Sequence, residues 1–339
     1  MNATIKDVAK VAGVSVASVS RALNGHENVT GTTRQRVLAA ATQLRYMPNN
    51  AARSLITRRT QTIGAVLPDL HGEFFSELIR GMDAAARAHG LHLLVSSSPG
   101  SAAEAGEVLR AMCGRVDGLL IMSPHADADM LADNLPASLP TVLMNTRVPG
   151  GHYRSLSIDN YGGACAMVQH LVSCGHRRIA FIAGPANNFD ADERLRGYRN
   201  VLQHRLPKQV ETILAGDFSE ESGYRAGLRL RELGDLPDAI FAANDMMALG
   251  CLFALNEQGI KVPDDVALAG FDDIPIARFV SPPLTTVRVR IADMGTQALE
   301  RLADAIERPH GSPRFSLELA CSLVVRQSCG DTTARANTS

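Results

Sequence analysis

The sequence predicts two structural parts: a small all-α helix-turn-helix headpiece, and an α/β core of two doubly wound lobes with parallel sheets. Apolar residues recur at helical spacing around a glycine near the N-terminus, and strand-like and helix-like runs alternate from residue 62 onward. Charge divides the chain in the same way. Residues 1–60 contain nine basic and two acidic residues, whereas the remainder contains 25 basic and 33 acidic residues. A basic module on an acidic body is typical of a chain in which one end meets phosphate.

Residues 5–24 predict two short amphipathic helices around a tight turn. Gly13 can adopt the positive φ that the turn needs, and small Ala9 lets the two helices cross closely. Ser15 is a good N-cap for the second helix. Val8, Val14, Val19 and Leu23 supply the apolar side. The remaining face is small and polar enough to enter a major groove, and it carries Val16, Ala17, Ser18, Ser20 and Arg21.

A third helix is expected after Thr30 or Thr32, either of which can cap it, because apolar residues recur at helical spacing up to Leu44. We expect the headpiece to span residues 1–48. Residues 49–60 then form a short helical segment and a basic linker. Helix nucleation is costly, so such a short segment needs a partner or DNA to become ordered.

The core is expected to span residues 61–326. Strand-like runs cover residues 63–67, 91–96, 118–122, 141–144, 179–183, 239–242 and 266–271, and helix-like runs cover 74–89, 161–174, 192–204, 219–233 and 245–258. This alternation predicts parallel sheets that are covered on both faces. Two lobes, roughly 61–160 with 290–320 and 161–289 with 321–326, would hold a ligand in the crevice where strand ends meet.

Several protein classes are disfavoured. The six cysteines are scattered without a C-x-x-C motif or an adjacent histidine cluster, which argues against zinc and against a disulfide framework. The sequence has no apolar run of membrane-spanning length and no signal peptide, so we expect a cytoplasmic protein that does not enter membranes. It also lacks the G-x-S-x-G, P-loop and G-x-G-x-x-G motifs. We therefore expect no enzymatic activity, no cofactor and no metal.

Six separated motifs occur in one order: residues 5–24, 45–49, 182–185, 243–250, 270–273 and 282–287. With them the chain resembles the LacI/GalR family of bacterial repressors over nearly its whole length. The resemblance implies a homodimer whose paired headpieces bind a pseudo-palindromic double-stranded operator. It also implies a core similar to periplasmic sugar-binding proteins. The segment 327–339 is polar and lacks heptads, so we expect a dimer with a disordered tail.

The resemblance assigns DNA contacts residue by residue. Arg21 would grip guanine O6 and N7, and Val16 and Ala17 would pack on a thymine methyl group. Leu55 would wedge between the central base pairs from a hinge helix in the minor groove. The other residues expected to touch or approach DNA are Thr4, Ser15, Ser18, Ser20, Asn24, Thr30 and Thr33 in the headpiece, with Asn49 and Ala52 in the hinge.

The effector pocket is likewise implied by the resemblance. Arg194 would donate to adjacent hydroxyls, or to a carboxylate or phosphate. Asp272 would accept from paired hydroxyls, and Asn244 would both donate and accept. Phe74 and Phe218 are candidates for stacking on a sugar ring, although either could be plain core. The remaining pocket positions are Asp69, Ser123 and Asn145.

These observations favour a repressor of carbohydrate-use genes that a sugar-like effector releases from its operator. Two alternatives stay open at this point. The chain could instead be a repressor that requires a corepressor, such as a phosphorylated metabolite or a purine. Less favoured is a small-molecule-binding protein without a role in gene regulation, because such a protein has no use for residues 5–24.

Overall fold

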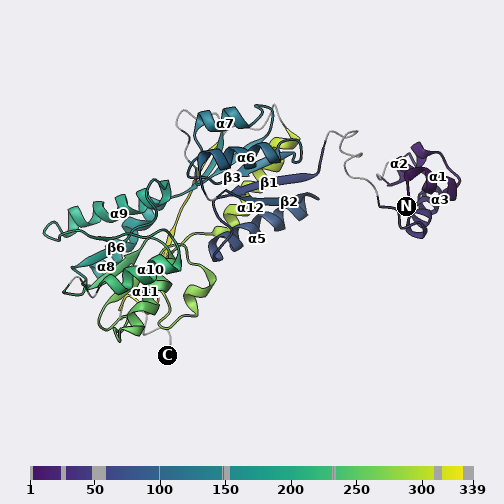
Figure 1. Cartoon of the computed structure of the whole chain (residues 1–339). Helices are drawn as coiled ribbons and strands as arrows, with labels where there is room; N and C mark the ends of the chain where they lie inside the picture. Colours follow the sequence, from purple (N-terminus) through teal and green to yellow (C-terminus); the bar gives the residue numbers. More distant parts are fainter. Residues whose placement is uncertain are drawn as a thin grey trace. The chain divides into compact units, whose positions relative to one another are not determined.

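The computed structural model describes residues 3–23, 28–47, 59–98, 100–146, 148, 153–230, 232, 234–308 and 315–330 (Figure 1). The chain divides into two compact units, Met1–Thr60 and Gln61–Ser339. The predicted DNA contacts of Asn24, Asn49, Ala52 and Leu55 lie outside the described residues.

The headpiece contains α1 (Ile5–Ala12), α2 (Val16–Leu23) and α3 (Gly31–Gln43). A capping box begins α1: the Thr4 amide donates to Asp7 Oδ2 at 2.8 Å, and the Asp7 amide donates to Thr4 Oγ1 at 3.4 Å. Gly13 ends the helix with φ 62°, as the turn requires. Ser15 caps α2 by accepting from the Ser18 amide at 3.1 Å. The predicted helix-turn-helix is therefore confirmed.

The three headpiece helices share one small core. Val8, Val19 and Val37 contribute one fully buried side chain from each helix. Alanines fill the space around them, which lets helices this short approach closely: Ala9, Ala12, Ala22, Ala40 and Ala41. Val14 and Leu23, which we expected in the core, are half-buried at its margin.

The first lobe of the core is built on a six-stranded parallel sheet in the order β11-β5-β4-β3-β1-β2. The two central strands, β3 and β4, are buried along their whole length because helices cover the sheet. The strands are β1 (Thr62–Leu67), β2 (His92–Ser97), β3 (Gly118–Ile121), β4 (Thr141–Met144), β5 (Arg154–Ile158) and β11 (Ser316–Leu319). The helices are α5 (Glu73–Ala88), α6 (Ala102–Met112), α7 (Ala128–Asn134) and α12 (Ile291–Glu307).

The second lobe has a four-stranded parallel sheet in the order β7-β6-β8-β9 and a separate antiparallel pair, β10 and β12. Its strands are β6 (Ile179–Ile182), β7 (Thr212–Leu214), β8 (Ala239–Ala242), β9 (Ala267–Ala269), β10 (Thr286–Arg288) and β12 (Ser322–Val324). Its helices are α8 (Asn160–Ser173), α9 (Phe189–Arg205), α10 (Glu220–Leu230), α11 (Asp245–Glu257) and the 3₁₀ helix η2 (Pro275–Arg278).

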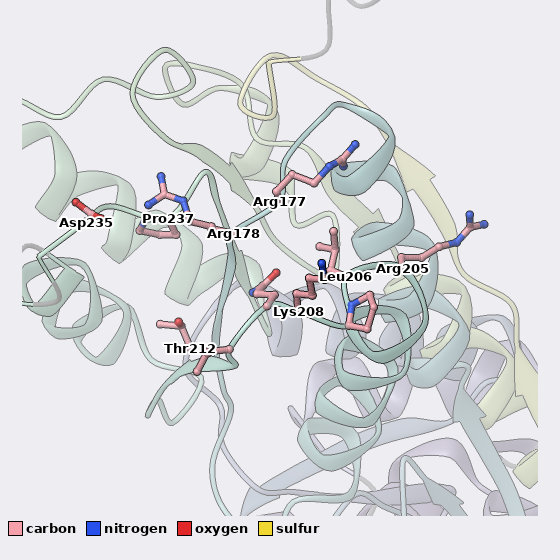
Figure 2. A pocket seen from close by; sticks show the side chains of 11 residues that line it. Arg177, Arg178, Arg205, Leu206, Lys208, Thr212, Asp235 and Pro237 are labelled. Carbon is pink, nitrogen blue, oxygen red and sulfur yellow. The ribbon is translucent and has the colours of Figure 1, made fainter.

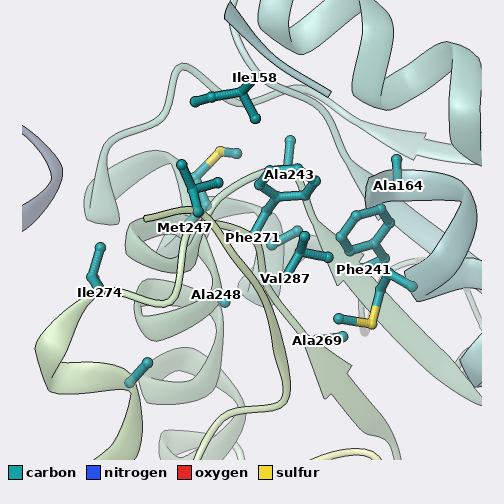
Figure 3. Packing of buried hydrophobic residues seen from close by; sticks show 14 of the residues in the cluster. Ile158, Ala164, Phe241, Ala243, Met247, Ala248, Ala269, Phe271, Ile274 and Val287 are labelled. Carbon is teal, nitrogen blue, oxygen red and sulfur yellow. The ribbon is translucent and has the colours of Figure 1, made fainter. Parts of the chain in front are cut away.

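The core of the second lobe centres on Phe271, which is fully buried (Figure 3). Phe241 on β8 and Val287 on β10 are also in this cluster, as are Ile158 and Met247. Ile158 ends the last strand before the chain enters this lobe, so the cluster extends to the crossing between the lobes.

The predicted fold class is confirmed, and strands 141–144 and 239–242 have the predicted bounds. Strands β5, β7, β10, β11 and β12 and helices α6, α7 and α12 were not predicted. Most of these strands have only three to five residues, so their periodicity is weak. Among the described residues, no helix has the length and apolarity that a bilayer crossing requires.

The expectation of a disordered tail from residue 327 is wrong for residues 327–330. Ser328 and Cys329 are fully buried. Ser328 Oγ donates to the carbonyl oxygen of Leu268 at 2.6 Å and accepts from the Thr285 amide at 2.8 Å. The polar character of this segment suggested that it is exposed to solvent. Ser328 instead makes its hydrogen bonds to backbone groups inside the second lobe. Residues 331–339 lie outside the described part.

Helices α10 and α11 cross at two glycines, Gly223 and Gly250. A Cβ at Gly250 would lie 1.9 Å from the Glu220 carbonyl oxygen. We therefore expect Gly250→Ala to lower the free energy of unfolding by about 1–3 kcal/mol, since overpacking outweighs the gain in helix propensity. Urea unfolding measures the change. Leu228→Ala, at an exposed site on α10, is the control and should have little effect; equal losses would contradict the crossing as the cause.

Candidate functional site

The headpiece presents an exposed face on α2. Val16 is 41% exposed, and Ser15, Ala17 and Arg21 are exposed with it. Val16 is therefore not a core residue. Apolar, small and cationic side chains side by side are suited to thymine methyl groups and guanine edges in a major groove. Ser18 and Ser20 are half-buried on the same helix.

The other described headpiece hydroxyls expected near DNA act as helix caps. Thr4 begins α1, and Thr30 begins α3 by accepting from the Thr33 amide at 3.4 Å. Thr30 Oγ1 also donates to Thr33 Oγ1 at 3.0 Å. Thr4, Thr30 and Thr33 thus lie in the first turns of α1 and α3, where their hydroxyl groups make hydrogen bonds within the headpiece, and their contacts with DNA stay predictions.

A cavity of about 610 Å³ lies between the two lobes of the core. All eight residues predicted for the effector pocket line it: Asp69, Phe74, Ser123, Asn145, Arg194, Phe218, Asn244 and Asp272. They come from loops that follow β1, β3 and β4 in the first lobe, and β7, β8 and β9 in the second, together with α5 and α9. The carboxyl ends of two parallel sheets thus face one space.

Arg194 organises the wall of this cavity from α9, and it is 3% exposed. Its Nε donates to Asn160 Oδ1 at 2.8 Å, and Nη1 donates to the carbonyl oxygen of Ala243 at 2.6 Å. Nη2 lies 3.2 Å from Asp272 Oδ1, in an ion pair that does not complete a hydrogen bond. The guanidinium carbon is 3.8 Å from the ring centroid of Phe271. Arg194 is thus largely held by protein groups, and its predicted donation to a ligand stays a prediction.

Two carboxyl groups share this one arginine. Burial raises the pKa of Asp272 to about 6, although Arg194 opposes the shift. Burial likewise raises the pKa of Asp190 to about 6, opposed by Arg194 and by a hydrogen bond from Asn160 Nδ2 at 2.8 Å. Burial also raises the pKa of Asp245, which accepts from Thr286 Oγ1 at 2.6 Å. Acidic groups therefore outnumber their cationic partner at this wall.

Two amide side chains differ in what they can offer a ligand. Neither polar atom of the buried Asn145 side chain completes a hydrogen bond, although its amide is near enough to Asp190 to favour the carboxylate. Asn244 already makes two hydrogen bonds: Oδ1 accepts from the Met247 amide at 2.9 Å, and Nδ2 donates to the Phe218 carbonyl at 2.9 Å. Asn244 therefore positions the Phe218 loop, whereas Asn145 has hydrogen-bonding capacity for a ligand.

Backbone strain is concentrated around the cavity. Asn145 has φ 44°, Phe218 has φ 73° and Asp272 has φ 116°. Asn tolerates the left-handed region, but it is uncommon for a bulky residue such as Phe218. Asn187, with φ 61°, lines the same cavity. Such strain persists only where the surroundings enforce it, and it marks functional sites.

Aromatic rings line both sides of the cavity. Phe74 on α5 packs edge to face with Phe75, with centroids 5.4 Å apart. Phe218 faces the cavity from the other lobe, and its ring centroid is 5.7 Å from the Arg194 guanidinium carbon. Both rings are half-buried, as a stacking surface requires. Neither is plain core.

The structure adds residues that sequence reasoning missed. Asn160 bridges Arg194 and Asp190, and all three are brought together from α8 and α9. The only sequence signal for Asn160 and Asp190 was that each is a polar residue in the first turn of a helix. The other cavity residues not predicted include His125, Thr146, Asn187, Asn188, Phe189 and Ser219.

A second hollow of about 890 Å³ lies elsewhere on the second lobe, near the ends of β6 and β7 (Figure 2). It is basic, with Arg177, Arg178, Arg205 and Lys208 around it. Arg178 forms an ion pair with Asp238 at 2.9 Å. No residue of the predicted effector pocket lines it, so it does not compete for that assignment.

The raised pKa of Asp190 predicts a pH dependence. The carboxyl has an ordinary pKa of 3.8 and a folded value of about 6, so stability is lost as pH rises between these values. We expect Asp190→Asn to gain free energy of unfolding relative to the wild type over that range, by roughly 1–2 kcal/mol because the cavity side is partly screened. The gain should level off above pH 6.

Urea unfolding from pH 4.5 to 7.5 measures this difference. Asp217→Asn is the matched control, because burial would raise the pKa of Asp217 but hydrogen bonds from Ser219 and Ser222 hold it below its ordinary value. Its difference from the wild type should stay constant over this range. A flat profile for Asp190→Asn would contradict the assigned shift.

Comparisons with known proteins agree with this geometry. The family "Bacterial regulatory proteins, lacI family" matches residues 4–49, and "Periplasmic binding protein-like domain" matches residues 168–329. The HTH-type transcriptional repressor PurR of Haemophilus influenzae (strain PittEE) is 34% identical over 332 residues, covering 96% of this chain and 98% of that protein.

Two solved structures are also similar. The lac repressor dimer bound to operator and the anti-inducer ONPF has a TM-score of 0.86 at 28% identity, and the match covers 97% of this chain and 99% of that one. The transcriptional regulator CelR in complex with cellobiose has a TM-score of 0.70 at 33% identity, covering 96% and 99%. The chain therefore belongs to the lacI family of bacterial regulatory proteins and is a DNA-binding regulator of transcription.

Proposed function

We propose that the protein represses transcription by binding operator DNA as a homodimer, and that a neutral, polyhydroxylated small molecule in the cavity controls this binding. The composition of the cavity carries the second half of the proposal. Hydrogen-bonding side chains and two aromatic rings surround a volume of about 610 Å³, which suits a ligand of sugar or nucleoside size.

Charge argues for a neutral ligand. Asp69, Asp190, Asp217 and Asp272 line the cavity, whereas Arg194 is the one Lys or Arg side chain among those lining residues that the structure describes. Arg194 is already paired with Asp272. A phosphate would therefore meet several carboxyl groups and one cation that is already paired, in a partly desolvated space where like charges repel strongly. This disfavours the phosphorylated corepressor considered from the sequence.

A neutral nucleoside or purine is the second candidate. The half-buried rings of Phe74 and Phe218 would stack on a base as well as on the C–H face of a sugar. The relative PurR adds weight to a purine, and the regulator CelR, solved with cellobiose, adds weight to a sugar.

A thermal-shift panel of the full chain separates these ligands. We expect neutral sugars or nucleosides to raise the melting temperature in proportion to the logarithm of concentration over Kd, since they bind the folded state. Sugar phosphates should give a smaller shift than the parent sugars. A response confined to phosphorylated ligands would overturn the charge argument.

Arg21→Ala tests the DNA half. If Arg21 makes a bidentate base contact, the variant should lose about 1–3 kcal/mol of discrimination between operator and unrelated DNA. Lys10→Ala is the matched control, because Lys10 is an exposed cation on α1 outside the reading helix. It should weaken binding equally on all sequences. Fluorescence anisotropy on both DNAs measures the ratio, and unchanged discrimination in Arg21→Ala would refute the contact.

Asn145→Gly tests the effector half. Glycine accepts the positive φ at this position, and the Asn145 amide has no completed hydrogen bond to lose. We expect at least tenfold weaker effector binding, of the order of one lost hydrogen bond, with operator binding unchanged in the absence of effector.

Arg194→Ala is the contrasting variant. It should also destabilise the core by about 3–5 kcal/mol, because it leaves Asp272 without its partner. Calorimetric ligand titration and urea unfolding distinguish the two effects. If Asn145→Gly binds the effector as tightly as the wild type, Asn145 is not a ligand contact.

A further inference from the structure

A cluster of metal-ligating side chains lies in the second lobe, outside the effector cavity. His170 and Cys174 lie one helical turn apart at the end of α8, and Cys329 reaches them from the segment after β12. His170 Nε2 is 3.2 Å from Cys329 Sγ and 3.6 Å from Cys174 Sγ. In the part of the chain that the structure describes, this is the one group of three such residues with all ligand atoms within 4.8 Å.

The spacing of these atoms fits one zinc ion. Zinc binds sulfur at about 2.3 Å and imidazole nitrogen at about 2.0–2.1 Å, usually in tetrahedral geometry. Tetrahedral ligands at such bond lengths lie about 3.5–3.8 Å apart. The two observed nitrogen–sulfur distances lie close to this range, and all three ligand atoms lie within 4.8 Å of one another.

The surroundings hold Cys329 in place. Thr285 Oγ1 donates to Cys329 Sγ at 3.2 Å. His176 Nε2 lies 3.0 Å from the carbonyl oxygen of Cys329. Cys329 is fully buried, whereas His170 and Cys174 are half-buried, so the cluster has one side toward solvent. Outer partners of this kind fix the direction of a ligand and tune its affinity.

We propose that His170, Cys174 and Cys329 bind one zinc ion, with a solvent molecule as the fourth ligand. The ion joins α8 to residues 326–330 and so fastens the last described segment to the second lobe. The scattered cysteines of the sequence did not indicate a zinc site. The pair His170 and Cys174, four residues apart on one helix face, was the local signal, and only the fold brings Cys329 to it.

Cobalt titration of the reduced, chelator-treated full chain tests the proposal. One Co²⁺ per chain should give a thiolate-to-cobalt charge-transfer band, and Zn²⁺ should displace it. Cys174→Ser should weaken Co²⁺ binding at least tenfold, since loss of an outer partner alone costs about that much. Cys165→Ser is the matched control, because Cys165 is a half-buried thiol on the same helix and lies outside the cluster. It should bind Co²⁺ like the wild type.

His170→Gln provides a second variant that keeps both thiols and should also lose affinity at least tenfold, so the test does not depend on a variant at the buried Cys329. No saturable binding by the reduced chain, or equal binding by Cys174→Ser, would overturn the proposal. The proposal would also be overturned if Cys174 and Cys329 form a disulfide in air and the reduced chain does not bind added metal. DNA and effector binding are measured separately, so failure here leaves the proposed function untouched.

Discussion

The core depends on one buried cation. Arg194 joins the start of α8, the end of β8 and the loop after β9, through Asn160, Ala243 and Asp272. Its guanidinium also lies on the face of Phe271, the centre of the apolar cluster of the second lobe (Figure 3). Burying such a charge is costly unless it is paired and hydrogen-bonded, and these partners meet that requirement. The same side chain therefore anchors the apolar core on one side and shapes the effector cavity on the other.

Backbone strain accompanies this arrangement in the cavity wall. The Phe218 carbonyl accepts from Asn244 and the Asp272 carboxyl pairs with Arg194, and both residues have positive φ values. The strain costs of order 1–3 kcal/mol per residue and is offset by buried contacts elsewhere. A ligand then meets groups that are already oriented, which lowers the ordering cost of binding.

Much of the fold could be predicted from the sequence, because most of the longer elements carry clear periodicity, although helix α12 was missed. Strands of three residues such as β7 and β10 carry no such signal, and their positions depend on tertiary pairing. The cavity residues were found through the family resemblance, but their roles were not. That Asn244 is used as a helix cap and Arg194 as a buried ion-pair partner depends on distances between segments far apart in the chain. The contact between Cys329 and His170 was not predicted for the same reason. No local sequence pattern indicates that the polar segment around Cys329 packs inside the second lobe.

The chain crosses between the lobes three times, between β5 and α8, between β10 and α12, and between β11 and β12. Asn160, the first residue of α8, directly follows one crossing and holds both Arg194 and Asp190. A second link joins the lobes where the Ile276 amide donates to Glu73 Oε2 at 2.9 Å. A ligand that contacts Asn145 on one side and Phe218 on the other can favour one angle between the lobes. Such a ligand shifts the equilibrium between two lobe arrangements only by the difference between its affinities for them. The network at Asn160 is placed to transmit that difference, because it belongs to the cavity wall and to the crossing at once.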